Sequence, residues 1–362
     1  MKLKHRQITI PVLVGNVIIG AQDKIVIQSM TNTKTHDIEA TLKQIDELVK
    51  EGCELVRVAV FDVADAKALP ELVQKAKCPL IADIHFNPEF AVQAIKAKVP
   101  KIRLNPGNIE NAKQIQEICN LANQYGTVIR IGVNSGSLPK KIEAKYGHSA
   151  KAMVEAAKHY VKNFEANNFF NIVISLKSSD PLMTIDSYLM AAKIFKYPFH
   201  IGVTEAGTMK YGSIKSAAGL GPIIYHGVGD TIRVSITGDP VQEIMVCKKI
   251  LSSFHLYENN VDIISCPTCG RLNFNLEKVT AEVEEYVKQF EFPLKVSILG
   301  CIVNGIGEAK GCDIGIAGSN KTGIIFEDGK ILKTVKQEIL VDELKKLIDK
   351  KYQYWKNKTK IK

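Results

Sequence analysis

Residues 54–105 read ELVRVAVFDVADAKALPELVQKAKCPLIADIHFNPEFAVQAIKAKVPKIRLN, and this stretch alternates short apolar segments with longer amphipathic ones. The short segments are rich in Val, Ile and Leu, which is typical of buried strands. The longer segments, such as PEFAVQAIKAK, have the spacing of helices with one apolar face. A strand followed by a helix, repeated, indicates a parallel sheet covered by helices.

The same alternation extends to both sides of this stretch. Eight strand–helix units in about 250 residues predict a (β/α)₈ barrel, an α/β fold of the TIM type. A doubly wound open sheet is the alternative. The eight strand-like segments are IVIQSM (25–30), ELVRVAV (54–60), PLIADI (79–84), KIRLN (101–105), TVIRIGV (127–133), NIVISLK (171–177), FHIGVTE (199–205) and TIRVSIT (231–237).

The pattern changes after residue 258. Two strand-like segments and a helical one at 276–290 are followed by two more strand-like runs around the turn EDGK (327–330). Thr334 and Gln337 have the spacing of a capping box for a last helix. We therefore expect two domains: a substrate-binding barrel over residues 1–257 and a small α+β domain over 258–362.

Composition is that of a globular protein. The chain has 362 residues, with 46% hydrophobic and 24% charged. No apolar run approaches the roughly 18 residues that a membrane span needs. The first residues, MKLKHRQITIPVLVG, lack the apolar core of a signal peptide. We expect a cytoplasmic protein with no membrane partner.

The net charge of +10 raises the possibility of a nucleic-acid partner. Its distribution argues against this, because residues 345–362 alone carry eight Lys and one Asp. A lysine-rich, solvated end after a helix is the simpler interpretation. We expect no nucleic-acid binding; a zinc-ribbon nucleic-acid binder that uses this tail is the alternative.

Three cysteines and a glutamate near the end of the chain have metal-ligand spacing. Cys266 and Cys269 form a C-x-x-C in SCPTCGR, while Cys301 and Glu308 open and close GCIVNGIGE. Soft thiolates favour zinc or iron–sulfur clusters. Three thiolates and one carboxylate form an unusual set for structural zinc. They suit a cluster in which one iron has a weaker oxygen ligand and can meet a substrate.

Cationic and polar side chains fall near the carboxyl ends of the expected barrel strands, where active sites of such barrels lie. Four arginines and a lysine outnumber the nearby acids, Asp83 and Glu205, although either acid could pair with a single cation. Arg and Lys bind phosphate oxygens well. We expect an anionic, phosphorylated substrate bound by Arg57, Arg103, Asn105, Arg130, Asn134, Lys177, Ser178, Arg233 and Ser235.

Seven segments, in this order, resemble the bacterial 4-hydroxy-3-methylbut-2-enyl diphosphate synthase family of the non-mevalonate isoprenoid pathway. The chain resembles the short bacterial form, because no large insertion fits between Ile236 and Val261. The segments are VIQSMTNT (26–33), ADIHF (82–86), RLNPGN (103–108), RIGVNSGSL (130–138), HIGVTEAG (200–207), SCPTCGR (265–271) and GCIVNGIGEAKGCDIGIAG (300–318).

The resemblance implies a barrel followed by a domain with a [4Fe–4S] cluster on Cys266, Cys269, Cys301 and Glu308. It implies a cyclic diphosphate substrate, 2-C-methyl-D-erythritol 2,4-cyclodiphosphate, opened by two electrons with loss of water. Glu308 would release the unique iron to substrate oxygen and so counts as catalytic. Glu205 is the expected proton donor or orienting group on the barrel.

The resemblance also implies an electron donor, flavodoxin or ferredoxin, since no flavin or nicotinamide motif is present. It implies a homodimer in which the cluster domain caps the neighbour's barrel; folding over its own barrel is the alternative. Two further questions stay open. Cys312 either joins a four-cysteine metal site or is a buried thiol. The whole chain could instead be a non-redox barrel transferase, similar to dihydropteroate synthase, with a structural metal.

Overall fold

The computed structural model describes residues 6–84, 87–105, 111–302, 311–319 and 321–359. The chain divides into two compact units, Met1–Leu256 and Tyr257–Lys362. Each unit is described by itself. No helix among the described residues is both long enough and apolar enough to cross a membrane.

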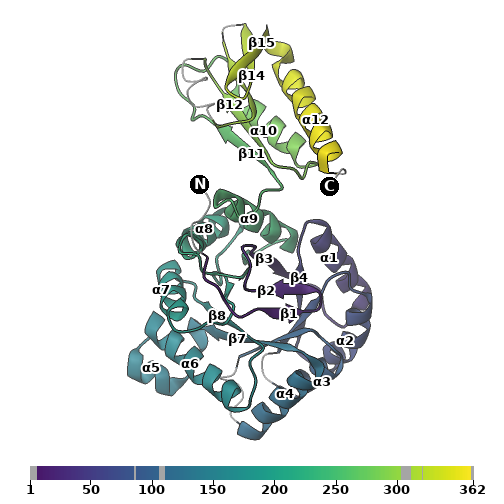
Figure 1. The fold of residues 1–362 in the computed structure, drawn as a ribbon, viewed down its shortest axis with the longest axis vertical. Helices are drawn as coiled ribbons and strands as arrows, with labels where there is room; N and C mark the ends of the chain where they lie inside the picture. The colour runs from purple at the N-terminus through teal and green to yellow at the C-terminus, as the bar shows by residue number, and fades with distance from the viewer. Residues whose placement is uncertain (1–5, 85–86, 106–110, 303–310, 320, 360–362) are drawn as a thin grey trace. The chain divides into compact units, whose positions relative to one another are not determined.

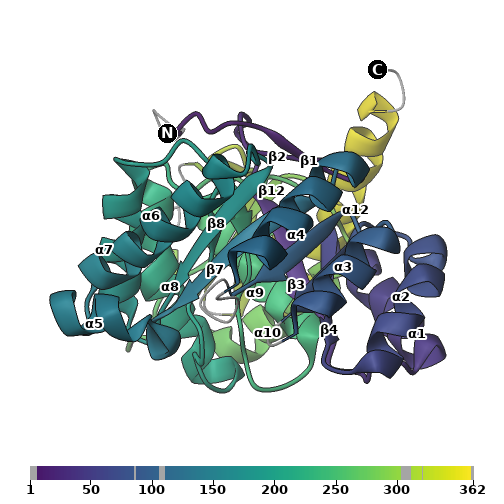
Figure 2. The same cartoon turned by 90° about the horizontal axis from the view of Figure 1, so that it is seen from below.

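Eight parallel strands of the first unit form a ring, seen from two directions in Figures 1 and 2. They pair in the order β8-β7-β6-β5-β4-β3-β10-β9, and a parallel bridge from Ile174 to Phe199 joins the two ends. The expected (β/α)₈ barrel is confirmed, and the open sheet is wrong. The strands are β3 (Val26–Met30), β4 (Leu55–Val60), β5 (Leu80–Ile84), β6 (Lys101–Leu104), β7 (Val128–Asn134), β8 (Ile172–Lys177), β9 (His200–Ile201) and β10 (Thr231–Ile232).

Helices follow the barrel strands and surround them (Figure 1). Several begin at an acidic or amide cap; Asp62, for example, accepts a hydrogen bond from the backbone of Asp65. Such caps satisfy the free N–H groups of a first turn. The helices are α1 (Ile38–Lys50), α2 (Val63–Lys75), α3 (Pro88–Lys96), α4 (Ala112–Tyr125), α5 (Lys140–Tyr146), α6 (Ala150–Ala166), α7 (Pro181–Ala192), α8 (Met209–Tyr225) and α9 (Pro240–Ser253), with a short 3₁₀ turn at Ser135–Ser137.

A hairpin that the sequence pattern does not predict closes one end of the barrel. β1 (Val12–Val14) and β2 (Val17–Ile19) pair antiparallel, and Figure 2 shows them at that end. Val12, Val14 and Ile19 pack on barrel residues. Strands of three residues give too little alternation to stand out in a sequence.

Helix α8 is also not evident from sequence, because its glycines weaken helical propensity. The structure shows what they are for. A Cβ at Gly219 would lie 2.7 Å from Val203 Cγ2, and one at Gly212 would lie 2.9 Å from Ile236 Cγ2. Glycine therefore lets this helix closely approach the segments that follow β9 and β10.

The last two barrel strands are shorter than expected, at two residues each instead of seven. Their ladder ends at Gly202 and Arg233. A Cβ at Gly202 would lie 2.5 Å from Lys177 Nζ, so a neighbouring side chain takes the space here. The residues that follow, including Glu205 and Ser235, leave the sheet as loops.

The second unit is a five-stranded mixed sheet with helices α10 and α12. β11, β12 and β13 are parallel, whereas β13, β14 and β15 are antiparallel. Its core joins the sheet and both helices through residues such as Val283, Val296 and Leu344. The elements are β11 (Val261–Ser265), α10 (Leu276–Val287), β12 (Leu294–Leu299), β13 (Ile314–Gly318), β14 (Thr322–Glu327), β15 (Lys330–Lys336), a 3₁₀ turn at Gln337–Ile339 and α12 (Leu340–Thr359).

Two expectations for this unit are wrong. Thr334 does not cap a helix, because it lies within β15 and pairs with Ile324. The lysine-rich end does not follow a helix, because it is itself helical as far as Thr359. Lys345 and Lys351 bond there to Glu282 and Glu327 of the same unit.

Candidate functional site

The hairpin at the closed end identifies which strand residues face the inside of the barrel. Val26, Leu55, Ile81, Val128 and Val173 pack against it and therefore point inward. Because side chains alternate along a strand, the residues two positions further also point inward. The interior thus changes from apolar to polar from one layer of side chains to the next. The polar layer consists of Gln28, Arg57, Asp83, Arg130 and Ser175.

Six cationic side chains gather around this polar layer; five start in or above it, and Lys101 starts one layer below, level with Ile81 and Val128. All are buried or nearly so, although Lys, Arg, Asp and Glu are almost never buried without a partner. Burial lowers the pKa of Arg57 to about 10. The six are Arg57 on β4, Lys101 and Arg103 on β6, Arg130 on β7, Lys177 at the end of β8 and Arg233 just after β10.

Two carboxylates, Asp83 and Glu243, neutralise part of this positive charge. Asp83 Oδ2 lies 3.6 Å from Arg57 Nε, and Asp83 Oδ1 lies 3.3 Å from Arg103 Nη1. Glu243 of α9 accepts two bonds from Arg233, both at 3.0 Å, and a third from Ser29 Oγ at 2.8 Å. Asp83 and Glu243 therefore hold three of the six cations in fixed positions.

Lys101 and Arg130 are buried without a carboxylate partner among the described residues. No hydrogen-bond partner is present for Lys101 Nζ or for Nε and Nη1 of Arg130 in the described part of the chain. Burial lowers the pKa of both groups well below their ordinary values, and neighbouring cations lower them further. An unpaired charge in a protein interior is costly. These atoms are thus positioned to bind an anion.

Lys177 is held by a histidine. Its Nζ lies 3.0 Å from His200 Nε2, and His200 Nδ1 lies 2.7 Å from Thr231 Oγ1. Burial and nearby cations lower the pKa of His200 well below its ordinary value, so the ring is neutral. The neutral ring then accepts from Lys177 Nζ at Nε2 and donates from Nδ1–H to Thr231. Burial and neighbouring cations also lower the pKa of Lys177 well below its ordinary value.

The charge balance of this region is positive. Six cations face two carboxylates among the residues that the structure describes. Buried charges usually require a counter-charge. An anionic ligand with several oxygens would supply it.

The remaining predicted binding residues lie around the upper rim. Asn105 Nδ2 donates to Ser137 Oγ at 3.1 Å, and Ser135 Oγ donates to Ser178 Oγ at 3.1 Å. Asn134 ends β7, and Ser235 follows β10; both are half-buried. The predicted binding residues thus come from five of the eight strands, β4, β6, β7, β8 and β10, to one end of the barrel.

Glu205 is exposed in the loop after β9, with a backbone φ of +52°. This left-handed conformation is uncommon for a residue other than glycine and marks local strain. No ion pair involves Glu205 in the described residues, and Arg57, Arg103 and Arg233 pair with Asp83 and Glu243 instead. The described residues therefore lend no support to its alternative role as their ion-pair partner.

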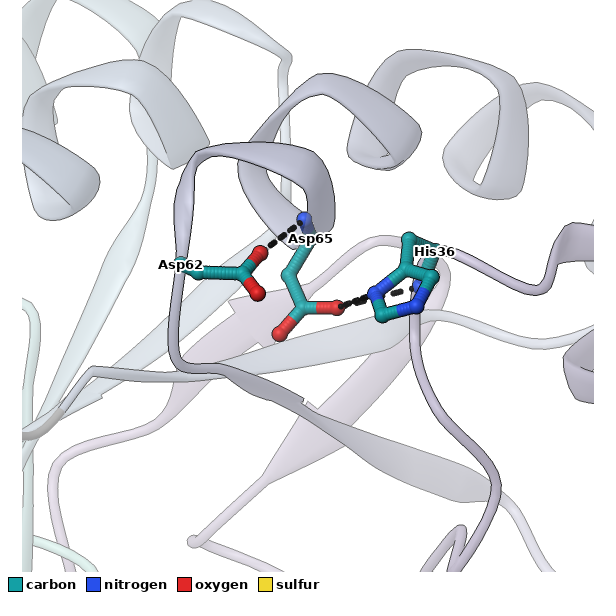
Figure 3. Close-up of side chains that lie close together, drawn as sticks. All are labelled: His36, Asp62 and Asp65. Atoms are coloured by element: carbon teal, nitrogen blue, oxygen red, sulfur yellow. Dashed lines mark hydrogen bonds and ion pairs between the residues drawn. The ribbon is translucent and has the colours of Figure 1, made fainter.

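A second polar cluster, drawn in Figure 3, joins two loops at the same end of the barrel. His36 Nδ1 lies 2.8 Å from Asp65 Oδ1, which also accepts the backbone N–H of His36. Asp65 Oδ2 accepts from Phe61 N, and Asp62 caps α2. The bonds of Asp65 fasten the loop after β3 to the loop after β4. These hydrogen bonds are enough to hold the two loops together, so the cluster needs no bound ion for that role.

In the second unit, parallel pairing brings two of the predicted metal ligands to one edge. Ser265 pairs with Ile298, so Cys266 and Cys301 follow the carboxyl ends of adjacent strands β11 and β12. Cys266 Sγ accepts a hydrogen bond of 3.2 Å from Gly300 N, next to Cys301. Cys269 lies close by in sequence and is exposed. Glu308 lies outside the described residues.

Cys312 lies at the opposite end of the same sheet. Ile314 pairs with Val296, which places Cys312 level with the start of β12, whereas Cys301 follows its end. A strand of this length spans roughly 17 Å at about 3.3 Å per residue. Cys312 is buried, and burial raises the pKa of its thiol. The four-cysteine site considered from sequence is therefore wrong, and Cys312 is a buried thiol.

The donor set at the carboxyl edge fits an iron–sulfur cluster. Three cysteines are free, and none of them is tied up in a disulfide among the described residues. Thiolates of this kind hold such clusters. A hydrogen bond from a backbone N–H to a ligand sulfur, like that from Gly300 to Cys266, is a usual way to tune them.

Sequence reasoning missed three residues of the barrel site. Lys101 and His200 lie on strands in register with predicted residues, so period-two alternation back from Arg103 and Gly202 could have found them. Glu243 carries no such signal, because it lies on a helix and reaches the site only through the fold.

Two family models match the chain in succession. The GcpE TIM-barrel domain matches residues 9–248, and the GcpE protein C-terminal domain matches residues 262–350.

Curated relatives match almost from end to end. The 4-hydroxy-3-methylbut-2-en-1-yl diphosphate synthase (flavodoxin) of Malacoplasma penetrans is 57% identical over 357 residues, 99% of each chain. The protein of the same name from Mycoplasmoides gallisepticum is 57% identical over 96% of this chain and 97% of its own. That of Bacillus licheniformis is 48% identical over 96% and 95%.

Among solved structures, dihydropteroate synthase of Yersinia pestis is 11% identical, with a TM-score of 0.46 over 67% of this chain and 98% of its own. A likeness at that level does not bear on function. The curated relatives do not favour the transferase alternative. With both models matched in order and relatives 57% identical over nearly their whole length, the chain belongs to the GcpE family.

Proposed function

We propose that this protein carries out the reaction for which its relatives are named, the synthesis of 4-hydroxy-3-methylbut-2-en-1-yl diphosphate with flavodoxin as the electron donor. The substrate is 2-C-methyl-D-erythritol 2,4-cyclodiphosphate. The observation that best supports this choice is the excess of buried cations at one end of the barrel. A cyclic diphosphate supplies the missing negative charge on several oxygens.

The barrel residues bind the two phosphates. Arg57, Arg103 and Arg233 are held in place by carboxylates, so their remaining N–H groups are oriented before the substrate arrives. Arg130 and Lys101 have atoms without a protein partner. Substrate phosphate oxygens would accept hydrogen bonds from them. The unfavourable burial of unpaired cationic groups would then be offset by charge-assisted hydrogen bonds. Asn105, Asn134, Ser178 and Ser235 add neutral donors at the rim.

Rate, as opposed to binding, requires contacts that strengthen during the reaction. One C–O bond of the ring breaks, its oxygen stays with the phosphate, and a hydroxyl leaves as water. Two electrons enter, one at a time, from the donor. Negative charge therefore grows on the departing phosphate oxygen, and a fixed ammonium such as Lys177 stabilises it. His200 keeps that ammonium in position.

The three cysteines Cys266, Cys269 and Cys301 hold a [4Fe–4S] cluster, with Glu308 as its fourth and weaker ligand. When bound, this cluster would transfer single electrons and offer one iron for substrate oxygen. Glu205 is the barrel-side proton donor or orienting group. Its exposed position and strained backbone support a role in contact with a ligand more than one in the fold.

An anaerobic assay tests the proposal. Purified protein loaded with iron and sulfide is mixed with the cyclodiphosphate and reduced flavodoxin, and products are followed by mass spectrometry. We expect the linear diphosphate with one water lost and two flavodoxin electrons consumed. Zinc at one per chain with no acid-labile sulfide, or no turnover by fully loaded protein, would contradict the proposal.

A further inference from the structure

Lys101 starts deeper in the barrel than the other cations of the site. It pairs with Ile81 on β5 and Val128 on β7, so its side chain begins in their apolar layer and points inward with them. Hairpin β1–β2 packs against this layer. The polar layer begins two residues further along the strands, at roughly 6.6 Å. The Lys101 side chain is fully buried, and its charged neighbours are Arg130 and Arg57.

The Lys101 amino group has no hydrogen-bond partner among the described residues. The two carboxylates of the site do not supply one, because Asp83 pairs with arginines of β4 and β6, and Glu243 pairs with Arg233. An isolated ammonium group in a protein interior is so costly that the group loses its proton instead. A buried lysine does this readily, whereas a guanidinium stays charged. Of the two unpaired groups, Lys101 and Arg130, Lys101 is therefore the one that can become neutral.

The charges around Lys101 favour the neutral amine. Burial lowers the pKa of Lys101 well below its ordinary value, and Arg130 and Arg57 lower it further. Hairpin β1–β2 adds only apolar side chains to this layer. Even without Lys101, five arginine and lysine side chains face two carboxylates among the described residues. The charged or titratable groups around the polar layer are Arg57 on β4, Asp83 on β5, Arg103 on β6, Arg130 on β7, Lys177 on β8, His200 on β9, Arg233 after β10 and Glu243 on α9.

Two comparisons within the site single out Lys101. Lys177 is also buried, but its Nζ lies 3.0 Å from His200 Nε2, an acceptor that stabilises a protonated amine. Lys101 lacks such an acceptor in the described part of the chain. In the layer above it, the fully buried amide of Gln28 has no partner for either Oε1 or Nε2 among the described residues. Buried polar groups of this kind are normally satisfied, which points to a ligand with several polar atoms.

We propose that Lys101 is a neutral amine in the ligand-free protein and takes up a proton from solvent when a phosphate-bearing anion enters the barrel. The anion supplies the counter-charge that the protein lacks, and the ammonium group then donates a charge-assisted hydrogen bond to it. No electron is transferred in this step. The inference rests on the proposed function for the identity of the anion, but its test needs neither the cluster nor turnover.

Titration calorimetry of the full chain with inorganic pyrophosphate tests the proposal. Binding heats measured at one pH in buffers of different ionisation enthalpy give the number of protons taken up per anion. At about pH 8 we expect the wild type to take up roughly 0.5–1 proton more than Lys101→Met, because the ionisation of pyrophosphate itself contributes equally to both. Lys101→Gln, measured in parallel, should behave like Lys101→Met. Circular dichroism checks that each variant is folded.

The matched control is Lys75→Met, which removes an exposed lysine of α2 that pairs with Glu71. It should take up as many protons as the wild type. Equal uptake by the wild type and the Lys101 variants would overturn this inference and leave the phosphate site intact. A wild type that does not bind pyrophosphate would overturn the phosphate site as well.

A ligand-free measurement tests the neutral amine by itself. The unfolded chain holds a proton on Lys101 up to about pH 10.4, whereas the folded chain does not, so the wild type should gain stability as the pH rises from about 7 to 10. Lys101→Met should lack this part of the gain. Urea midpoints of the two proteins at several pH values show the difference. Parallel curves would mean that Lys101 is charged in the folded protein and would overturn the proposal.

Discussion

Lys177 Nζ lies 3.0 Å from His200 Nε2 inside the barrel, and both side chains are buried. His200 is in turn fixed by Thr231. A lysine has a long, flexible side chain, and this contact removes much of its freedom. The role that the structure gives His200 is therefore to position Lys177, and this role makes a specific prediction.

His200→Gln should weaken the binding of inorganic pyrophosphate by about three- to tenfold, since one neutral hydrogen bond is worth roughly 0.5–1.5 kcal/mol. The same change in a Lys177→Met background should have almost no further effect, because the two residues act together. Isothermal titration of the four proteins measures this. Equal losses in both backgrounds would mean that His200 acts independently of Lys177.

The buried His200 ring also predicts a pH dependence of stability. Its pKa is lowered in the folded state, while the unfolded chain binds a proton near pH 6.5. The unfolded state therefore holds more protons below that pH, and stability falls as the pH drops below about 6.5. We expect His200→Gln to lose part of this fall between pH 6.5 and 5. Urea midpoints at several pH values, compared between the two proteins, check it; parallel curves would contradict the prediction.

Arg130 should show opposite effects on stability and binding. Its Nε and Nη1 lack protein partners, so Arg130→Met should leave the ligand-free protein as stable or up to a few kcal/mol more stable. Pyrophosphate affinity should fall by roughly tenfold to a hundredfold, as expected for a charge-assisted bond. Urea unfolding and titration measure the two effects. A loss of stability above about 2 kcal/mol would show that Arg130 supports the fold itself.

Loss of the Asp83 charge, in contrast, should lower stability, because this carboxylate pairs with both Arg57 and Arg103. Asp83→Asn should destabilise the ligand-free protein by about 3 kcal/mol, since it leaves buried cations without their counter-charge. Added pyrophosphate should restore part of that loss. Glu71→Gln is the control: it removes an exposed pair with Lys75 and should cost less than about 1 kcal/mol. Similar losses in both variants would contradict the prediction.

The two ends of β12 predict different behaviour for two cysteines. Cys301→Ser should lose the visible absorbance of the cluster together with activity, because oxygen is a poor substitute for thiolate at iron. Cys312→Ser should keep iron, sulfide and activity close to wild type. Iron and sulfide per chain are measured on anaerobically prepared protein. Metal loss in Cys312→Ser would return that cysteine to the ligand set.

The barrel could be predicted from sequence because strand and helix periodicity are local properties. The alternation of short apolar and longer amphipathic segments, seen around residues 54–105, indicates a buried strand followed by a helix wherever it occurs. Eight such repeats predict a closed barrel. The cationic side chains were found the same way, from their positions at strand ends. The hairpin β1–β2 and helix α8 were missed because three-residue strands and glycine-rich helices carry weak local signals.

The tertiary structure decided which groups pair and which do not. Glu243 bonds to Arg233 across the fold, and Glu205 does not pair with a cation in the described residues, although sequence position made Glu205, like Asp83, a candidate partner. The register of β12 and β13 separated Cys312 from Cys301, although eleven residues of sequence cannot show this. Local sequence determines secondary structure and residue type, whereas distances between side chains depend on strand register and packing, which only the folded chain fixes.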